Sequence, residues 1–269
     1  GKLQQQTVWR QQSAPRHLGR IGSITMAELA ALSEETLEEM YDAAETAVEC
    51  QRILQNTGDN IVSELLRHQP PFVEWDHFPK GDVYDQRTCS QYYYHAHAAD
   101  QRVKDEHGHF HVFIRPGSLG LGIRPVRLAD YKARARPNNE VCHLIGVSMD
   151  KFGQVMRLFT TNRWVTGETW FAADDVIRLL EHFKMDHAQP SWPVNLWLNS
   201  IVTVFKPTIR TLITERDKTI AAHVSQSNNT FVYEDRGLEV TSQAFVHLPD
   251  QIAAIERVLY PDGLESVAD

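Results

Sequence analysis

The sequence predicts an α+β fold, in which an antiparallel sheet of two hairpins and one late strand packs against N- and C-terminal helices. Two observations predict it. Apolar residues recur at helical spacing near both ends of the chain, whereas separate runs rich in Val, Ile, Tyr and Phe occur between residues 91 and 160. These strand-like runs come in pairs joined by polar segments, which favours antiparallel pairing. With 269 residues, of which 42% are hydrophobic, the chain can bury a substantial core.

Charge divides the beginning of the chain. Residues 1–24 contain four Lys and Arg residues and no acid, which is typical of a basic and flexible arm. Residues 21–50 contain eight acids and no Lys or Arg. Thr25 and Glu28 form a capping box that predicts a short helix, and apolar spacing from Leu37 to Leu54 predicts a long one with a solvated acidic face. A single α+β domain is expected over residues 25–269.

Two hairpins are expected in the middle of the chain. The first pairs residues 91–98 with residues 109–114, and the second pairs residues 141–149 with residues 154–160. A short helix is expected over residues 60–68. Residues 72–88 and 116–139 are expected to be irregular, because Pro and Gly interrupt both segments.

Helices return in the last third of the chain. Residues 173–183 have acids at their start, and a longer helical region follows from Ser191 to about Val224, with a kink expected at Pro207. A strand around residues 238–240 and a helix over residues 249–259 complete the prediction.

Composition limits the classes of partner. The formal net charge is −8, which argues against a nucleic-acid binder and against attraction to an anionic membrane surface. No apolar run approaches the roughly 18–20 residues of a membrane span. The three cysteines lack metal-type spacing and are odd in number, so a reducing, cytoplasmic setting is expected. The expected partner is a small-molecule substrate.

Five of the 13 histidines lie in the first hairpin, at His95, His97, His107, His109 and His111. Side chains of a strand alternate between faces, so any register that pairs odd with odd residues puts all five imidazoles on one surface. One such register sets His95 opposite His111, and a shift of two residues sets His95 opposite His109. The even residues of the second strand are apolar and predict a reverse face that packs on the long helices.

Three or four of these imidazoles could bind one metal ion. A nitrogen-rich set suits iron, copper, nickel or zinc rather than calcium or magnesium. We expect a transition metal ion, with iron first and then copper or zinc, and with Tyr93 and Phe113 as the apolar wall of its site. Three further residues are left open: Glu106, whose strand parity points it away, Glu168 between two tryptophans, and His143 in the next strand.

Two resemblances accompany these patterns. The run His107-Gly108-His109-Phe110-His111 resembles the motif of the histidine-triad nucleotide hydrolases and transferases, which implies that His109 is a nucleophile towards phosphate. Gly108 departs from the apolar residue of that motif. Over most of its length, notably in residues 92–97 and 159–170, the sequence resembles an uncharacterised family of bacterial hypothetical proteins. This resemblance carries no information about an activity.

The histidine hairpin predicts a metal-dependent enzyme, of a redox type similar to non-haem iron or copper oxygenases and oxidases. A non-catalytic metal-binding or sensing protein is the first alternative. A phosphoryl or nucleotidyl transferase or hydrolase of the histidine-triad type is the second.

Overall fold

The computed structural model describes residues 24–67, 69, 71–128, 140–227 and 231–263. Within these residues, six strands form one sheet in which every strand pairs antiparallel with its neighbour in chain order. The strands are β1 (Phe78–Asp85), β2 (Ser90–His95), β3 (Glu106–Ile114), β4 (Cys142–Asp150), β5 (Val155–Thr161) and β6 (Val240–Phe245). A meander of this kind needs only local connections, as consecutive antiparallel strands do.

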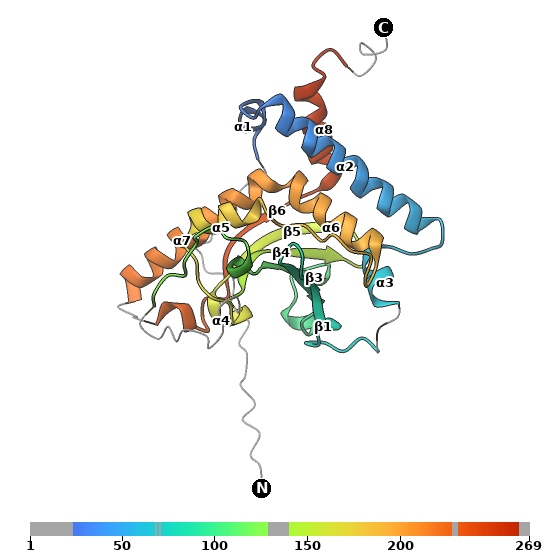
Figure 1. Ribbon diagram of the computed structural model, residues 1–269. Coiled ribbons are helices and arrows are strands. Elements are labelled where there is room, and N and C mark those ends of the chain that lie inside the picture. Colours follow the sequence, from blue (N-terminus) through green and yellow to red (C-terminus); the bar gives the residue numbers. More distant parts are fainter. Residues whose placement is uncertain (1–23, 68, 70, 129–139, 228–230, 264–269) are drawn as a thin grey trace.

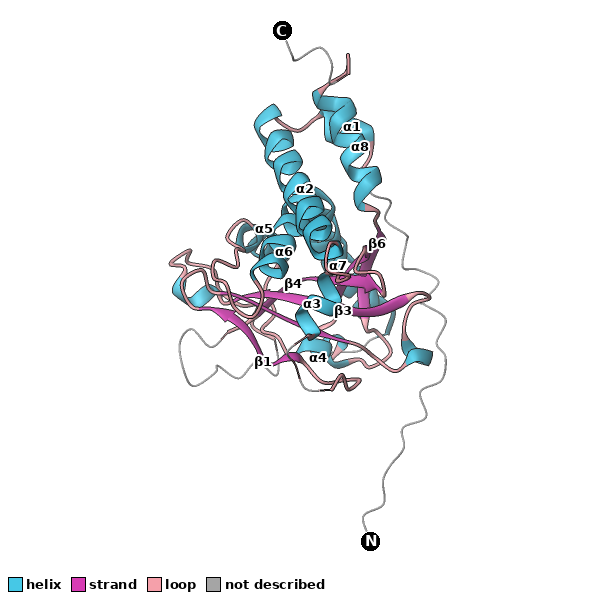
Figure 2. Ribbon diagram, turned by 90° about the vertical axis from the view of Figure 1, so that its right-hand side faces the viewer, coloured by secondary structure: helices cyan, strands magenta, loops and turns pink. Residues whose placement is uncertain are grey.

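Eight helices lie within the described residues (Figures 1 and 2). They are α1 (Met26–Ala30), α2 (Glu34–Gln55), α3 (Ile61–Leu66), α4 (Arg163–Thr166), α5 (Ala173–Leu180), α6 (Trp192–Val204), α7 (Lys206–Ser227) and α8 (Leu248–Leu259). Figure 2 shows α2, α6 and α7 stacked above the strands, with α4 below them. The predicted α+β class, with helices from both ends of the chain, is confirmed.

The core lies between the sheet and these helices. Phe110, Val112 and Ile114 are all fully buried, and the ring of Phe110 lies 6.0 Å from that of Trp197 in α6. The predicted apolar reverse face of β3 is therefore confirmed. Since the helices take up this face, the odd-numbered side chains of β2 and of residues 109–113 in β3 project from the opposite face of the sheet.

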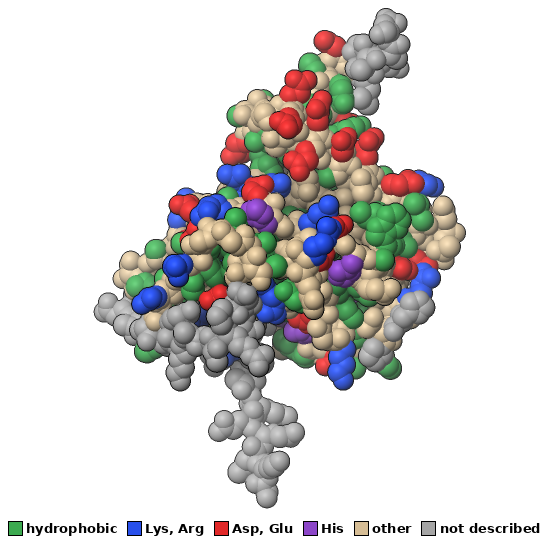
Figure 3. All heavy atoms as spheres, viewed as in Figure 1, with side chains coloured by type: hydrophobic (Ala, Val, Ile, Leu, Met, Phe, Trp, Pro, Cys, Tyr) green, Lys and Arg blue, Asp and Glu red, His purple; other side chains and the backbone are tan. Residues whose placement is uncertain are grey.

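A helical projection rises away from the sheet (Figure 1). It consists of α1, the first half of α2, and α8, and its own small core contains Leu29, Leu37, Met40 and Ile255. Thr25 caps α1 through the expected capping box with Glu28. Acidic side chains gather on the outside of this projection (Figure 3), as expected for a solvated helix face.

The structure corrects two element predictions. Residues 78–85, expected to be irregular, form β1, which tolerates Pro79 and Gly81 because it is an edge strand and pairs only with β2. The expected kink at Pro207 is a break at Phe205 between α6 and α7. Pro207 is the second residue of α7, a position where the missing N–H has no helical partner to lose.

The remaining sequence expectations concern the basic arm, membrane-spanning segments and the cysteines. The expected basic arm lies outside the described residues except for Ile24, as does part of the 116–139 connection. None of the described helices is both long and apolar enough to cross a membrane. Cys50, Cys89 and Cys142 are free and buried.

Candidate metal centre

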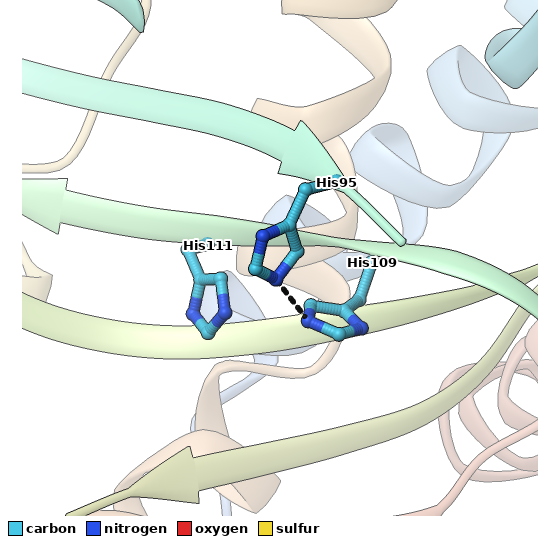
Figure 4. A group of neighbouring side chains, drawn as sticks. All are labelled: His95, His109 and His111. Atoms are coloured by element: carbon cyan, nitrogen blue, oxygen red, sulfur yellow. Dashed lines mark hydrogen bonds between the residues drawn. The ribbon is translucent and has the colours of Figure 1, made fainter. Parts of the chain in front are cut away.

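Three histidines converge on the sheet face that the long helices leave uncovered. His95 pairs directly with His109, which is the second of the two expected registers, and His111 follows on the same strand. The three residues are 8%, 4% and 1% exposed in that order. Each offers a ring nitrogen within 4.8 Å of those of the other two, and the ring centroids lie 4.6–5.2 Å apart. Figure 4 shows the three rings on one side of the strands. We call this group the histidine triplet.

Glu106 reaches the triplet because of a bulge in β3. At His107 two residues of β3 advance against one of β4, so the alternation of side chains shifts by one position. Glu106 therefore shares the face of His109, contrary to the expectation from its parity. Its Oε1 lies 2.6 Å from His109 Nδ1, and its Oε2 accepts a hydrogen bond of 3.1 Å from Arg157 of β5.

A second irregularity brings His143 to the same face. Leu144 is the extra residue of β4 opposite β3, so the side chain of His143 turns towards His111. His143 Nε2 lies 2.9 Å from His111 Nδ1, and His143 Nδ1 lies 3.5 Å from the hydroxyl of Thr161. His143, which the sequence left open, thus contacts the triplet from outside.

These contacts allow the ring protons to be assigned. The Glu106 carboxylate only accepts, so His109 donates from Nδ1 and carries its lone pair on Nε2. His109 Nε2 lies 2.7 Å from His95 Nε2, which then donates to it. If His111 donates from Nδ1 to His143, its own Nε2 lone pair is free. An outer hydrogen-bond partner thus fixes the orientation of two of the three rings, as the partners of metal-bound histidines do.

Burial disfavours the charged form of four imidazoles in and around the triplet, those of His95, His97, His111 and His143. Desolvation first, and the neighbouring histidines second, lower the pKa of His95 and of His111 far below the usual range. Burial also lowers the pKa of His143 to about 3 and that of His97 to about 4. A neutral imidazole is the form that binds metal, so these rings need no deprotonation before they accept an ion.

His107 lies apart from the triplet. The bulge turns its ring to the hydroxyl of Tyr94, whose oxygen lies 2.7 Å from His107 Nδ1. The next residue, Gly108, has no space for a side chain, because a Cβ there would lie 2.6 Å from the carbonyl oxygen of His95 and from the Tyr94 hydroxyl. The sequence expectation that His107 shares the face of His109 is therefore wrong. A glycine inside a strand pattern is a signal of such a bulge.

His97 lies beside the triplet but outside it. Strand β2 ends at His95, and the ring of His97 is 5.1 Å from the rings of both His95 and His109. The indole of Trp75 stacks on its outer side, with 4.3 Å between centroids.

His77, which lies outside the predicted hairpin, also reaches this region. Its ring stacks on Tyr93 at 3.6 Å and meets the edge of the His95 ring at 5.7 Å. Its Nδ1 lies 2.9 Å from a carboxylate oxygen of Asp82. The pairing of Phe78 with Tyr94 in β1 and β2 places His77 beside His95. Because the sequence did not predict β1, it gave no reason to group His77 with the hairpin.

Aromatic rings wall the triplet. The rings of Tyr93 and Phe113 lie 5.6 Å apart, and each is within about 6 Å of the His111 ring, at 5.1 and 6.2 Å. These two residues were expected to form the apolar wall. Phe159 of β5 adds an edge contact to His109 at 5.2 Å. A low-dielectric wall of this kind strengthens the interactions of any charge held inside it.

Glu168 serves the backbone of the centre rather than the triplet. Its Oε2 accepts a hydrogen bond of 2.8 Å from the His143 N–H, while its buried Oε1 has no hydrogen-bond partner among the described residues. Burial raises the pKa of Glu168 to about 7. The triplet is the group of His, Cys, Asp and Glu residues in the described part of the chain that is close enough to hold a metal ion.

The arrangement suits one transition metal ion with nitrogen ligands. Three neutral imidazoles on one side of an ion leave positions on its other side, as in catalytic three-histidine sites. The ring separations allow the nitrogens to approach one point at the roughly 2.0–2.1 Å that metal–imidazole bonds require.

Comparison with known proteins gives a family. No curated protein and no solved structure matches the chain. Residues 41–246, from within α2 to the end of β6, match the family described as a domain of unknown function, DUF6969. The match contains all six strands and every residue of the centre. It covers well over half of the sequence, so this chain belongs to the DUF6969 family, which agrees with the resemblance to an uncharacterised family.

Proposed function

We propose that this protein is a metal-dependent enzyme whose single transition metal ion is held by His95, His109 and His111. The observation that carries the proposal is the burial of three imidazoles with their ring nitrogens within 4.8 Å of one another. Burial and close packing disfavour protonation of His95 and of His111, and an ion bound by the three rings would compensate for that cost. Iron is the first choice of metal, followed by copper or zinc.

The role of each side chain follows from its contacts. Glu106 holds the Nδ1 proton of His109 and so points the Nε2 lone pair into the triplet. His143 does the same for His111. His95, which donates from Nε2 to His109 in the metal-free protein, carries its proton on Nδ1 when Nε2 binds the ion.

The proposal favours catalysis because three protein ligands leave room for an external ligand. A bound ion supplies Lewis acidity and, in the case of iron or copper, one-electron chemistry. The rings of Tyr93, Phe113 and Phe159 exclude water from the triplet, which favours a small and largely apolar substrate. The three free, buried cysteines are consistent with the reducing, cytoplasmic setting that the proposal assumes.

The other two functions receive less support. The histidine-triad resemblance depends on alternating histidines on one face, and His107 is turned to Tyr94 instead. A non-catalytic metal-binding or sensing protein would have a closed ligand shell, and the described residues bring three histidines rather than four into the group.

Metal content of the purified protein tests the proposal. Wild-type protein prepared without chelator is expected to contain about one equivalent of transition metal, measured by elemental analysis together with optical and EPR spectra. His109→Ala removes a ligand from the middle of the triplet and is expected to lose that metal. His107→Ala is the matched control. His107 lies on the same strand, two positions from His109, but its ring faces Tyr94 instead of the triplet.

Two results would contradict the proposal. Equal metal content in wild type and His109→Ala would show that the triplet does not hold the ion. Loss of metal in His107→Ala with a folded protein would show that the ligand set is different from the one proposed. Circular dichroism of each variant distinguishes loss of a ligand from loss of the fold.

A further inference from the structure

His97 and Trp75 form a stacked pair at the edge of the histidine triplet. The centroid of the His97 ring is 5.1 Å from those of His95 and His109, a separation within the 4.6–5.2 Å range found inside the triplet itself. His97 is therefore near enough to act as a ligand, although its ring nitrogens do not lie within 4.8 Å of those of all three triplet histidines.

The His97 side chain is held by stacking rather than by hydrogen bonds. Among the described residues, its ring nitrogens have no hydrogen-bond partner, whereas its backbone carbonyl accepts from Arg102. The residue follows the end of β2 in a segment without regular structure, so no strand pairing fixes its side chain. The indole of Trp75 covers its outer side at 4.3 Å, with the two rings 18° from parallel.

The backbone of Trp75 is strained to make this contact. Its φ is +71°, a conformation that a bulky residue rarely adopts. Its N–H donates a hydrogen bond of 2.9 Å to the carbonyl of Ala96, and the neighbouring Glu74 pairs with Arg102 at 2.7 Å. Trp75 nonetheless remains 53% exposed, so burial does not explain its position. Strain that persists without burial is a reason to look for a role in function.

We propose that His97 is an exchangeable fourth ligand of the metal centre, which Trp75 holds aside so that one coordination position stays open to a small external ligand. The inference rests on the proposed function and adds to it the control of the open position. When the stack on Trp75 is intact, the external ligand has access to the ion. When the His97 ring leaves Trp75, its nitrogen takes that position and the shell closes with four imidazoles.

The experiment uses full-length protein loaded with one equivalent of Cu²⁺ and azide as the external ligand. The nitrogen hyperfine pattern in EPR reports the number of bound imidazoles, and the azide-to-copper absorption band gives the Kd for azide. Three variants are compared with wild type. His97→Ala removes the competing ligand, Trp75→Asn removes the indole with a residue that accepts positive φ, and Trp192→Ala removes another exposed tryptophan at the start of α6.

Opposite shifts are expected for the first two variants. His97→Ala should keep its copper and bind azide at least as tightly as wild type. Trp75→Asn should show an added nitrogen and a Kd for azide about fivefold weaker, because one aromatic stack stabilises the open population by about that ratio. Trp192→Ala should match wild type.

The failures of this inference and of the proposed function are distinct. Unchanged azide affinity and nitrogen count in Trp75→Asn would overturn the role of the stack. Loss of copper in His97→Ala would overturn the exchangeable role, because His97 would then be a permanent ligand. Failure of wild-type protein to bind Cu²⁺ would instead contradict the metal centre itself.

Discussion

Replacement of Glu106 by Gln tests whether this carboxylate only stabilises the fold or also strengthens metal binding through His109. Glu106 is 8% exposed, and its carboxylate contacts His109 Nδ1 at 2.6 Å and Arg157 at 3.1 Å. Burial alone would raise the pKa of Glu106, but the hydrogen bond from His109 and the charge of Arg157 lower it on balance. Glu106 is thus a buried anion between two nitrogen donors.

Two effects of known size are expected from Glu106→Gln. Loss of a carboxylate behind a metal-bound histidine lowers metal affinity by about 10- to 100-fold. Loss of the charge also leaves the buried Arg157 guanidinium without its counterion, which costs about 3–5 kcal/mol. For a chain of this size, that free energy corresponds to a fall in Tm of about 10 °C.

The assay measures both quantities on the same samples. Competition with a chromophoric chelator gives the Kd for Zn²⁺, and thermal denaturation of the metal-free protein gives Tm. Glu49→Gln is the matched control, because Glu49 also pairs with an arginine, Arg52, but on the surface of α2, where such a pair contributes about 0–1 kcal/mol. Wild-type Zn²⁺ affinity in Glu106→Gln would refute the role of Glu106 behind His109.

Three further perturbations test other parts of the structure. Phe110→Ala should cost about 3–5 kcal/mol of stability in chemical denaturation while metal binding by the folded protein persists, since Phe110 lies on the helix side of the sheet. Gly146→Ala places a Cβ 2.4 Å from the Phe159 ring, which contacts His109, so titration should show weaker metal binding and denaturation a loss of about 1–3 kcal/mol. Metal-free protein should lose stability as pH falls below about 6.5, because buried histidines with lowered pKa values take up protons only on unfolding. Each such histidine lowers the free energy of unfolding by about 1.4 kcal/mol per pH unit, so the three together lower it by about 4 kcal/mol per pH unit. Circular dichroism should then show an unfolding midpoint between about pH 5 and pH 3, and a stability independent of pH over that window would contradict burial of neutral rings at His95, His111 and His143.

Periodicity predicted most of the fold because most of its elements obey local rules. Alternation in β2 and β3 gave the apolar reverse face of Phe110 and Val112, and the odd-with-odd pairing put His95 opposite His109 in one of two expected registers. The long helices followed from their apolar spacing and caps. Strand β1 was missed because Pro79 and Gly81 are typical of turns, and only its position at the sheet edge makes them acceptable.

The outer part of the centre could not be predicted in the same way. Strict alternation sends Glu106 away from His109 and brings His107 towards it, and the bulge at His107 reverses both. A second bulge, at Leu144, brings in His143. Bulges depend on pairing between strands, so a single strand's pattern does not reveal them, although Gly108 in a strand was a signal of the first.

Anomalous X-ray scattering from crystals of protein purified without chelator tests the metal centre most directly. The account predicts one anomalous peak, on the sheet face opposite the long helices, within about 2.0–2.2 Å of ring nitrogens of His95, His109 and His111. Collection at the absorption edges of iron, copper and zinc identifies the element. An anomalous map with no peak at the triplet, or with a peak whose ligands are other side chains, would contradict the account.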